Sequence, residues 1–237
     1  MKAFILAAGL GTRLRSLGLD LPKVMAPIGG KPLLQHHLEL LRRQGVREFI
    51  INLHHLPERI TSYFGDGSAF GVTIAYSLEM ELLGTAGAVK KMEATVRGET
   101  LLVLYGDNLF RFEVAPLVEF HRSRQALATI GLWESPEPWT GGVVETDADG
   151  RVQRFVEKPD RKEVSTNLIN AGIYLLEPAV LDAIPSGQFC DFGKDVFPKL
   201  LAQGKDLYAM KPNAYVQDIG TPERLAKAQR DYEGWQQ

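Results

Sequence analysis

The sequence predicts an α/β fold of the Rossmann-like, three-layer α/β/α type, in which a mixed sheet carries a small antiparallel lobe. Apolar runs and amphipathic segments alternate through the first half of the chain, as in the right-handed crossovers of a mostly parallel sheet. After Asp107 the pattern changes to β runs joined by the turn-forming DADG, which indicates antiparallel strands. No Pro/Gly/Ser-rich linker interrupts the chain, so we expect one domain over residues 1–237, with halves of about 1–110 and 111–237.

Each expected element has a local signal. The run KAFILA is a continuous apolar strand, and Pro32 opens a helix with leucines at helical spacing that Gly45 ends. The expected strands of the first half are 2–7, 47–53, 72–77 and 100–105, and the expected helices are 32–45, 57–64 and 85–95. In the second half we expect helices at 114–123, near Pro178, near Lys194 and from Pro222, and strands in ALATIGLW, GGVVETDADGRVQRFVEKP, 167–176, LYAMK and AYVQDI.

Composition excludes several classes of protein. A chain of 237 residues with 45% hydrophobic and 24% charged residues is ordinary for a globular protein. Its net charge of −2 argues against a nucleic-acid binder that works by bulk electrostatics. The chain shows no targeting segment and no apolar run near the roughly 18 residues of a membrane helix, so we expect a cytoplasmic protein. The single cysteine, Cys190, excludes an internal disulfide and is expected to be a structural thiol.

A loop of small residues and cations follows the first strand. Gly9 and Gly11 remove bulk, while Arg13 and Lys23 bring positive charge to the same turn, a combination that indicates phosphate binding. A P-loop needs Gly-Lys-Ser/Thr at a spacing that GLGTRLRS does not supply, and a dinucleotide-binding GxGxxG needs glycine where Leu14 stands. A tight turn without a ligand would explain the glycines but not the cations.

LAAGLGTRLRSL followed by PKVMAPIGGKP resembles the N-terminal motif of the sugar-1-phosphate nucleotidylyltransferases. The resemblance continues in family order through LLGTAGAVKK, YGDNLF, GGVVETDADGRVQRFVEKP, NLINAGIYLLEPAVL and YVQDIGTPERL. It implies an enzyme that joins an NTP and a sugar 1-phosphate into an NDP-sugar and pyrophosphate, with the first half binding the nucleotide and the second half the sugar. Because the chain ends soon after its final helix, we expect no fused acyltransferase region.

The resemblance implies roles for individual residues. Arg13 and Lys23 are the catalytic candidates, on the β and γ phosphates and near the α-phosphate respectively. Asp107 and Asp218 each end a strand and are expected to hold Mg²⁺ together. The nucleotide-binding candidates are Leu6, Ala8, Gly9, Gly11, Thr12, Arg13, Glu79, Glu81, Gly84 and Thr85. The sugar-binding candidates are Asn108, Gly142, Glu157, Lys158 and Asn170, of which Asn108 could instead assist the metal.

The identity of the base depends on Glu79 and Glu81. A carboxylate suits the two adjacent donors of guanine, whereas an amide suits a uracil or thymine edge, so these residues favour GTP. The alternative is that both glutamates are solvated loop charges. Phrases such as GTAGAVKK, INAGIYLLEPAVL and KDVFPKLL resemble the mannose 1-phosphate guanylyltransferases, and a related heptose 1-phosphate fits as well.

Two departures from the family pattern keep the sugar open. The usual PKP is PKV here, and a frequent Tyr-Gly-Val is replaced by residues 140–143, which removes an aromatic from the sugar side. Uridylyl or thymidylyl transfer to glucose 1-phosphate or an amino sugar 1-phosphate is a second hypothesis. A catalytically silent regulatory homologue is a third, although Arg13, Lys23, Asp107 and Asp218 are all present.

The predicted helices carry three histidines, His36, His37 and His121. We expect them to be partly buried or exposed rather than catalytic. A homo-oligomer is left open.

Overall fold

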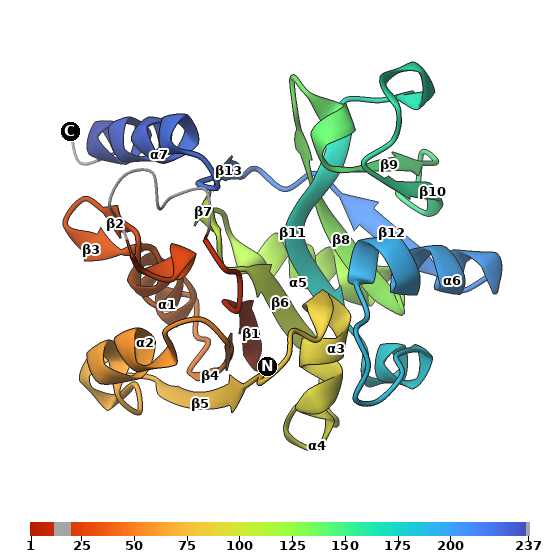
Figure 1. The fold of residues 1–237 in the computed structure, drawn as a ribbon. Coiled ribbons are helices and arrows are strands. Elements are labelled where there is room, and N and C mark those ends of the chain that lie inside the picture. Colours follow the sequence, from red (N-terminus) through yellow and green to blue (C-terminus); the bar gives the residue numbers. More distant parts are fainter. Residues whose placement is uncertain (12–19, 236–237) are drawn as a thin grey trace. The chain divides into compact units, whose positions relative to one another are not determined.

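The computed structural model describes residues 1–11 and 20–235, which form two compact units that interleave along the chain (Figure 1). The β1 unit consists of residues 2–82, 104–112 and 215–237, and the β8 unit consists of residue 1 with 83–103 and 113–214. The strand β6 (Leu101–Tyr105) is divided between them. Each unit therefore receives segments that lie far apart in the sequence.

The β1 unit contains strands in the order β6-β1-β4-β5, of which β1, β4 and β5 run parallel. Its strands are β1 (Ala3–Leu6), β4 (Glu48–Leu53) and β5 (Thr73–Leu78), with the end of β6 beside β1. β4 is buried from Phe49 to Leu53, which explains its nearly continuous apolar sequence, because a parallel strand is covered on both faces.

Helices complete this unit at positions that the sequence signals. They are α1 (Leu33–Arg43), α2 (Pro57–Phe64) and α7 (Pro222–Gly234), with the short turns η2 (Lys23–Met25) and η3 (Ser68–Phe70). Pro57 occupies the first turn of α2, and Thr221 caps α7 through a bond from the Arg224 amide to its Oγ1 of 3.3 Å. One face of α1 is fully buried, at Leu33, Leu34, His37, Leu38 and Leu41.

Two small antiparallel sheets join parts of the β1 unit. One pairs β7 (Asn108–Arg111) with β13 (Tyr215–Asp218), and the other pairs β2 (Pro27–Ile28) with β3 (Lys31–Pro32). A buried apolar cluster packs beneath them, made of Ala26, Ile28, Leu33, Leu109, Ile219, Leu225 and Ala228. This cluster fixes α7 against the segments that lead into and out of the strand ends.

The β8 unit is mainly antiparallel. Its strands are β8 (Ala128–Glu134), β9 (Gly142–Thr146), β10 (Val152–Glu157), β11 (Leu168–Leu176) and β12 (Leu207–Met210). Strand β11 pairs with both β8 and β9, β10 pairs with β9, and β12 runs parallel to β8. Its helical segments are α3 (Gly84–Lys91), α4 (Glu93–Val96), α5 (Val114–Ser123), α6 (Phe197–Ala202), η4 (Pro138–Thr140), η5 (Arg161–Glu163), η6 (Pro178–Ala183) and the π-helical η7 (Phe192–Val196).

The predicted fold class is confirmed as mixed α/β, with a central mixed sheet and small antiparallel sheets. The expected helices at 57–64 and 114–123 match α2 and α5 to the residue, while the helix expected over 85–95 is interrupted at Met92. Strand β7 was not expected from the sequence. Throughout the described residues, none of the helices is both long enough and apolar enough to cross a membrane.

Candidate active site

Asp107 and Asp218 come together at one end of the β7–β13 ladder. Asp218 is the register partner of Asn108, which directly follows Asp107, and the Ile219 amide donates a 3.1 Å hydrogen bond to the Asp107 carbonyl. Two carboxylates separated by more than a hundred residues are thus fixed at neighbouring backbone positions. The antiparallel pairing, rather than the parallel sheet, brings them together.

Each carboxylate has a cationic partner in the same unit, and Asp218 also has a backbone partner. Lys23 Nζ lies 2.9 Å from Asp107 Oδ2, and only 14% of the Lys23 side chain is exposed. Asp218 Oδ1 accepts a hydrogen bond from the Gly220 amide, and its Oδ2 lies 3.4 Å from an Arg224 guanidinium nitrogen. The site is therefore preformed, with its negative charge balanced by neighbouring cations.

The donor chemistry of this site fits a hard divalent cation. Carboxylate oxygens from two strand ends are the ligands that Mg²⁺ prefers, and Mg²⁺ is usually held by one or two carboxylates together with substrate phosphates. Among the described residues no group of three or more His, Cys, Asp or Glu could hold a metal by itself. Asp107 and Asp218 would therefore suit a cation that arrives with a phosphate ligand.

The start of the glycine loop is anchored by a buried polar chain. Asn52 Oδ1 accepts a 2.7 Å bond from the Ala7 amide, and Asn52 Nδ2 donates a 2.8 Å bond to Glu79 Oε1. Glu79 and Asn52 are almost completely buried, so Glu79 is not a solvated loop charge, whereas Glu81 is exposed. Glu79 is thus held beside the loop that follows β1.

Other parts of the loop are placed in the same unit. Leu6 accepts a 2.9 Å bond from the Gly106 amide, and a Cβ on Gly106 would meet that carbonyl oxygen at 2.6 Å. Gly11 has a positive φ of 63°, and a Cβ there would come within 3.3 Å of Lys23 Cγ. Ala8 is buried and Gly9 is exposed. The predicted residues Thr12 and Arg13 lie outside the described part of the chain.

In the β8 unit, the predicted nucleotide-binding residues Gly84 and Thr85 contact the segment that begins at Cys190. Gly84 has a φ of 72°, and a Cβ there would lie 2.5 Å from the Cys190 carbonyl oxygen. Thr85 Oγ1 donates to Asp191 Oδ2 at 2.9 Å and accepts from the Phe192 amide at 2.9 Å. Asp191 also accepts bonds from the amides of η7, so one carboxylate fixes two segments.

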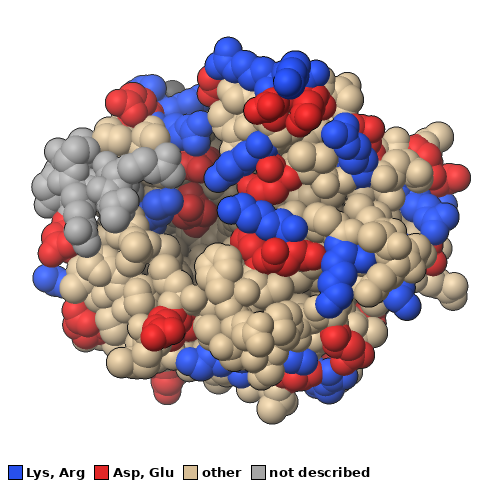
Figure 2. Space-filling view, turned by 45° about the vertical axis from the view of Figure 1, so that its right-hand side comes forward, with Lys and Arg blue, Asp and Glu red and all other residues tan. Residues whose placement is uncertain are grey.

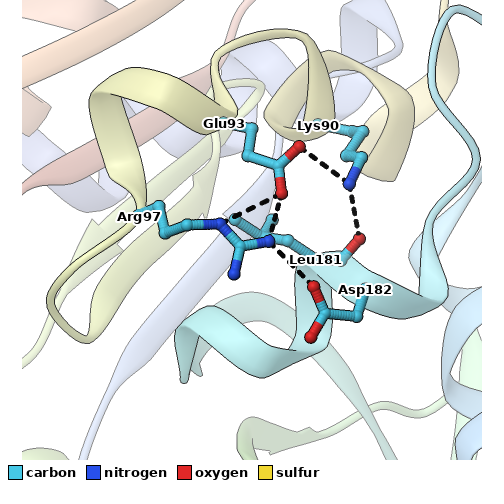
Figure 3. A network of polar contacts seen from close by, with 5 residues as sticks. All are labelled: Lys90, Glu93, Arg97, Leu181 and Asp182. Carbon is cyan, nitrogen blue, oxygen red and sulfur yellow. Dashed lines mark hydrogen bonds and ion pairs between the residues drawn. The ribbon is translucent and has the colours of Figure 1, made fainter.

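The C-terminal end of the α3–α4 segment is held by a polar network (Figure 3). Lys90 Nζ lies 2.8 Å from Glu93 Oε2 and donates to the Leu181 carbonyl at 3.0 Å. Arg97 binds Glu93 and lies 2.8 Å from Asp182 Oδ1. The network ties α3 and α4 to η6, so the α3–α4 segment is attached to the start of η7 through Thr85 and to η6 through Lys90 and Arg97.

Glu157 and Gly142 face each other across the β9–β10 pair. They are register partners, and a Cβ on Gly142 would lie 2.8 Å from Glu157 Oε2. A Cβ on Gly193 would lie 2.9 Å from the same oxygen. Burial, and next to it the negative charge of Asp191, raises the pKa of the Glu157 carboxyl above its usual value. The glycines leave room for this carboxylate, and its partial burial shields it from water.

Lys158 and Asn170 occupy different surroundings. Lys158 is exposed, takes a left-handed φ of 51°, and donates from its amide to the Gly141 carbonyl at 3.0 Å. Asn170 donates from Nδ2 to the Tyr174 hydroxyl at 2.6 Å and accepts from the Gly172 amide at 2.8 Å, so it stabilises an irregularity in β11. In the β1 unit, Asn108 lies on β7, and its carbonyl contacts His37 Nε2 at 2.7 Å.

The structure adds residues that the sequence interpretation did not single out, namely Asn52, Asp191 and Gly193. An Asp two residues ahead of a glycine and before a helical segment is a recognisable capping signal at Asp191, whereas nothing in the sequence pairs Asn52 with Glu79. Cys190 is buried and its thiol pKa is raised by burial, which agrees with a structural thiol.

The histidine prediction needs a correction in detail. His37 and His121 are almost completely buried, not partly buried or exposed, because both fall on the inward faces of their helices. His121 Nδ1 contacts Thr129 Oγ1 at 2.8 Å, and its Nε2 contacts Glu177 Oε1 at 3.0 Å. Of these three histidines, only His36 is partly exposed. These contacts are structural.

Charges of both signs alternate over the face shown in Figure 2, with no extended surface of one sign. This distribution agrees with the net charge of −2 and provides no broad basic surface on that face for a nucleic-acid backbone.

The family profile described as Nucleotidyl transferase matches residues 2–234. The chain belongs to this family. It is 43% identical over 233 residues to a UTP–glucose-1-phosphate uridylyltransferase of Synechocystis sp.. This alignment covers 93% of this chain and 60% of the relative. It is 38% identical over 230 residues to a mannose-1-phosphate guanylyltransferase of Mycobacterium tuberculosis, covering 97% of this chain and 64% of the relative. The nucleotidyl transferase chain thus spans less than two thirds of these relatives.

Among solved structures, the chain is similar to HddC from Yersinia pseudotuberculosis complexed with GMP-PN. The match has a TM-score of 0.82 and 31% sequence identity, and it covers 98% of this chain and 99% of that one. The resemblance to the nucleotidyl transferases that the sequence motifs indicate is therefore confirmed at the level of both sequence and fold.

Proposed function

We propose that this nucleotidyl transferase moves a nucleotidyl group from an NTP to a sugar 1-phosphate, giving an NDP-sugar and pyrophosphate, with GTP and mannose or heptose 1-phosphate as the favoured pair. An oxygen of the sugar phosphate attacks the α-phosphorus, the new P–O bond forms, and the bond from the α-phosphorus to the bridging oxygen of pyrophosphate breaks. The electron pair leaves with pyrophosphate. Both reactants are polyanions, so the protein must supply positive charge and orientation more than covalent chemistry.

The observation that carries the proposal is the juxtaposition of Asp107, Asp218 and Lys23 in the β1 unit. In the structure Lys23 and Asp107 neutralise each other at 2.9 Å. A triphosphate with its cation offers the complementary partners, phosphate for the lysine and metal for the carboxylate. Lys23 would act as a compact positive charge near the α-phosphate, and Arg13 would bind the β and γ phosphates.

Asp107 and Asp218 would hold Mg²⁺. When bound, the ion supplies positive charge that offsets repulsion between the two substrates and the charge developing on pyrophosphate. Leu6, Ala8, Gly9, Gly11 and Thr12 would present backbone groups to the nucleotide. The anchoring of Leu6 to Gly106 and of Ala7 to Asn52 supports a preorganised start of this loop.

Two observations favour guanine. Glu79 is a buried carboxylate whose direction is restrained by Asn52, as a residue that accepts from adjacent base donors would need to be. The similar HddC structure carries GMP-PN. Glu81 is exposed and is the weaker of the two base-reading candidates.

On the sugar side, Glu157 would accept hydrogen bonds from sugar hydroxyls and Lys158 would contact the sugar phosphate. Gly142 leaves space directly beside the Glu157 carboxylate. Asn170 and Asn108 remain sugar-binding candidates, with Asn170 already bound to Tyr174 and Gly172.

The test is pyrophosphate release in the presence of Mg²⁺ across GTP, UTP, dTTP, CTP and ATP, each against mannose, heptose, glucose and N-acetylglucosamine 1-phosphates. Release confined to GTP supports the proposed pair and identifies the sugar. If no pair of substrates releases pyrophosphate, the proposed reaction is overturned and a sugar-nucleotide-binding regulatory homologue is favoured.

A second candidate is uridylyl transfer to glucose 1-phosphate. It is favoured by the 43% identity to the Synechocystis uridylyltransferase. Release with UTP and glucose 1-phosphate, and not with GTP, would select it and discard the base-reading role of Glu79.

A further inference from the structure

The connection from β10 to β11 forms a strap, residues 158–167, that begins directly after Glu157. Its first residue is Lys158, whose side chain is exposed and whose backbone is left-handed. A residue other than glycine rarely adopts such a φ unless contacts with its surroundings maintain it. The contacts that hold the strap therefore decide where the Lys158 ammonium points.

Both ends of the strap are fastened by hydrogen bonds. At the start, the Lys158 amide donates to the Gly141 carbonyl at 3.0 Å. Near the end, Ser165 Oγ donates to Glu145 Oε1 at 2.5 Å, and the Ser135 amide donates to the Asn167 carbonyl at 2.9 Å. These bonds attach the strap to β9 and to the connection between β8 and β9.

The middle of the strap is held by an aromatic contact. The Arg161 guanidinium carbon lies 4.1 Å from the centroid of the Trp139 ring, a close cation–π stack. Trp139 belongs to η4, two residues ahead of Gly141. The segment 139–141 thus holds the strap twice, through the Trp139 ring and through the Gly141 carbonyl. Lys158 is itself the residue bound to Gly141, three positions ahead of Arg161.

We propose that the Trp139–Arg161 stack is a latch that positions Lys158, so that both residues are positioning residues that set the affinity for the sugar 1-phosphate. This inference rests on the proposed function. The sequence lacks the Tyr-Gly-Val aromatic at residues 140–143, and Trp139 supplies an aromatic ring just ahead of that place. The Trp139 ring stacks against Arg161 and so holds the strap rather than a sugar. Arg161 acts through this stack, not as a phosphate ligand itself.

The test measures KM for the sugar 1-phosphate and for the NTP, together with kcat, in single and double variants. Trp139→Ala and Arg161→Ala should each raise the sugar KM about three- to fivefold, the factor that an exposed cation–π contact provides, and leave the NTP KM unchanged. The double variant should be no worse than either single one, because both remove the same contact. Trp139→Phe should restore most of the affinity, since it keeps a ring face.

Arg151→Ala is the matched control. Arg151 is another exposed arginine next to the β9–β10 hairpin, and its partner Asp206, at 2.7 Å, lies outside the strap. Unchanged sugar KM in Trp139→Ala, additive effects in the double variant, or an equal rise in Arg151→Ala would each overturn the latch. A rise in Arg161→Ala without one in Trp139→Ala would show direct binding by Arg161 instead.

Hydrogen exchange separates failure of the latch from failure of the proposed reaction. In the free chain, amides of the strap from residue 158 to residue 164 should exchange faster in Trp139→Ala than in the wild type. Inactive wild type would overturn the proposed function and with it the positioning role. Active wild type with unaltered strap exchange in Trp139→Ala would overturn the latch alone.

Discussion

Thr85 Oγ1 donates a 2.9 Å hydrogen bond to Asp191 Oδ2, across 106 positions of sequence. The same hydroxyl accepts a bond from the Phe192 amide, so the turn that opens α3 and the start of η7 share one polar joint. Asp191 is also the negative charge that helps to raise the pKa of the Glu157 carboxyl. A nucleotide-binding candidate and a sugar-binding candidate are thereby coupled within the β8 unit.

Removing this joint should destabilise the protein. Asp191→Ala deprives Thr85 and the amides of Gly193 and Lys194 of their acceptor, so we expect the free energy of unfolding to fall by about 1–2 kcal/mol. Urea denaturation measures the change. Asp191→Asn keeps an oxygen for the η7 amides and should lose less; equal losses in both variants would contradict the capping role.

Glu157 should make folding less favourable as its carboxyl ionises. Its folded-state pKa is raised, so the folded state binds the proton more tightly, and stability is lost as the pH rises from about 4 through that raised pKa. Glu157→Gln cannot ionise and should therefore gain stability relative to the wild type over this window. Denaturation midpoints at several pH values test this, and a constant difference from pH 3 to pH 8 would contradict it.

His37 should produce the opposite pH dependence. Burial lowers its pKa to about 4, so the neutral form is strongly favoured in the folded state. The neutral His37 contributes its full stabilisation, about 3 kcal/mol, above about pH 6.5. This contribution is lost as the pH falls towards 4. His37→Gln keeps a donor for the Asn108 carbonyl and should flatten this part of the stability profile. Identical pH slopes in the two proteins would show that His37 does not titrate as expected.

The paired carboxylates should be required for turnover. Asp107→Asn and Asp218→Asn remove negative charge but little volume, and each should lower kcat about 100-fold or more if they hold Mg²⁺. Melting temperatures measured without Mg²⁺ should remain close to the wild-type value, because these side chains lie at the end of the ladder rather than in the core. Arg224→Ala, which removes an Asp218 partner, is the control; normal Mg²⁺-dependent rates in both Asn variants would reject the metal assignment.

Glu79→Gln tests the base-reading hypothesis. The amide oxygen can still accept from Asn52 Nδ2, so the fold should be retained. Loss of the carboxylate should reduce the preference for GTP over UTP by about tenfold or more, since the second guanine donor loses its acceptor. The ratio of kcat/KM values for the two nucleotides measures this. The exposed Glu81→Gln should leave the ratio nearly unchanged.

Much of the local structure follows from local chemistry. Pro57 and Pro222 begin their helices where the sequence places them, and the DADG turn joins β9 and β10 because Asp147 accepts from the amides of Asp149 and Arg151. These signals depend on a few adjacent residues. The helix starts and the turn can therefore be predicted without knowledge of the rest of the chain.

Other features depended on long-range pairing. The expectation that Asp107 and Asp218 meet came from strand ends, yet the ladder that aligns them includes β7, which the sequence did not predict because its four residues carry no distinct pattern. Likewise His37 and His121 were expected to be partly buried or exposed, whereas packing buries both almost completely. Periodicity indicates which face of a helix turns inward, but not how deeply a neighbour covers it.

The sequence by itself determined the α/β class, the positions of the longer helices and strands, and the family to which the chain belongs, because composition, periodicity and ordered motifs indicate these features. Only the tertiary structure decided that Asn52 restrains Glu79, that Asp191 joins Thr85 to η7, and that Arg161 stacks on Trp139. Hydrogen bonds and ring contacts act over a few ångströms. Which residues come within that range depends on strand register and packing, which no single segment of the sequence specifies.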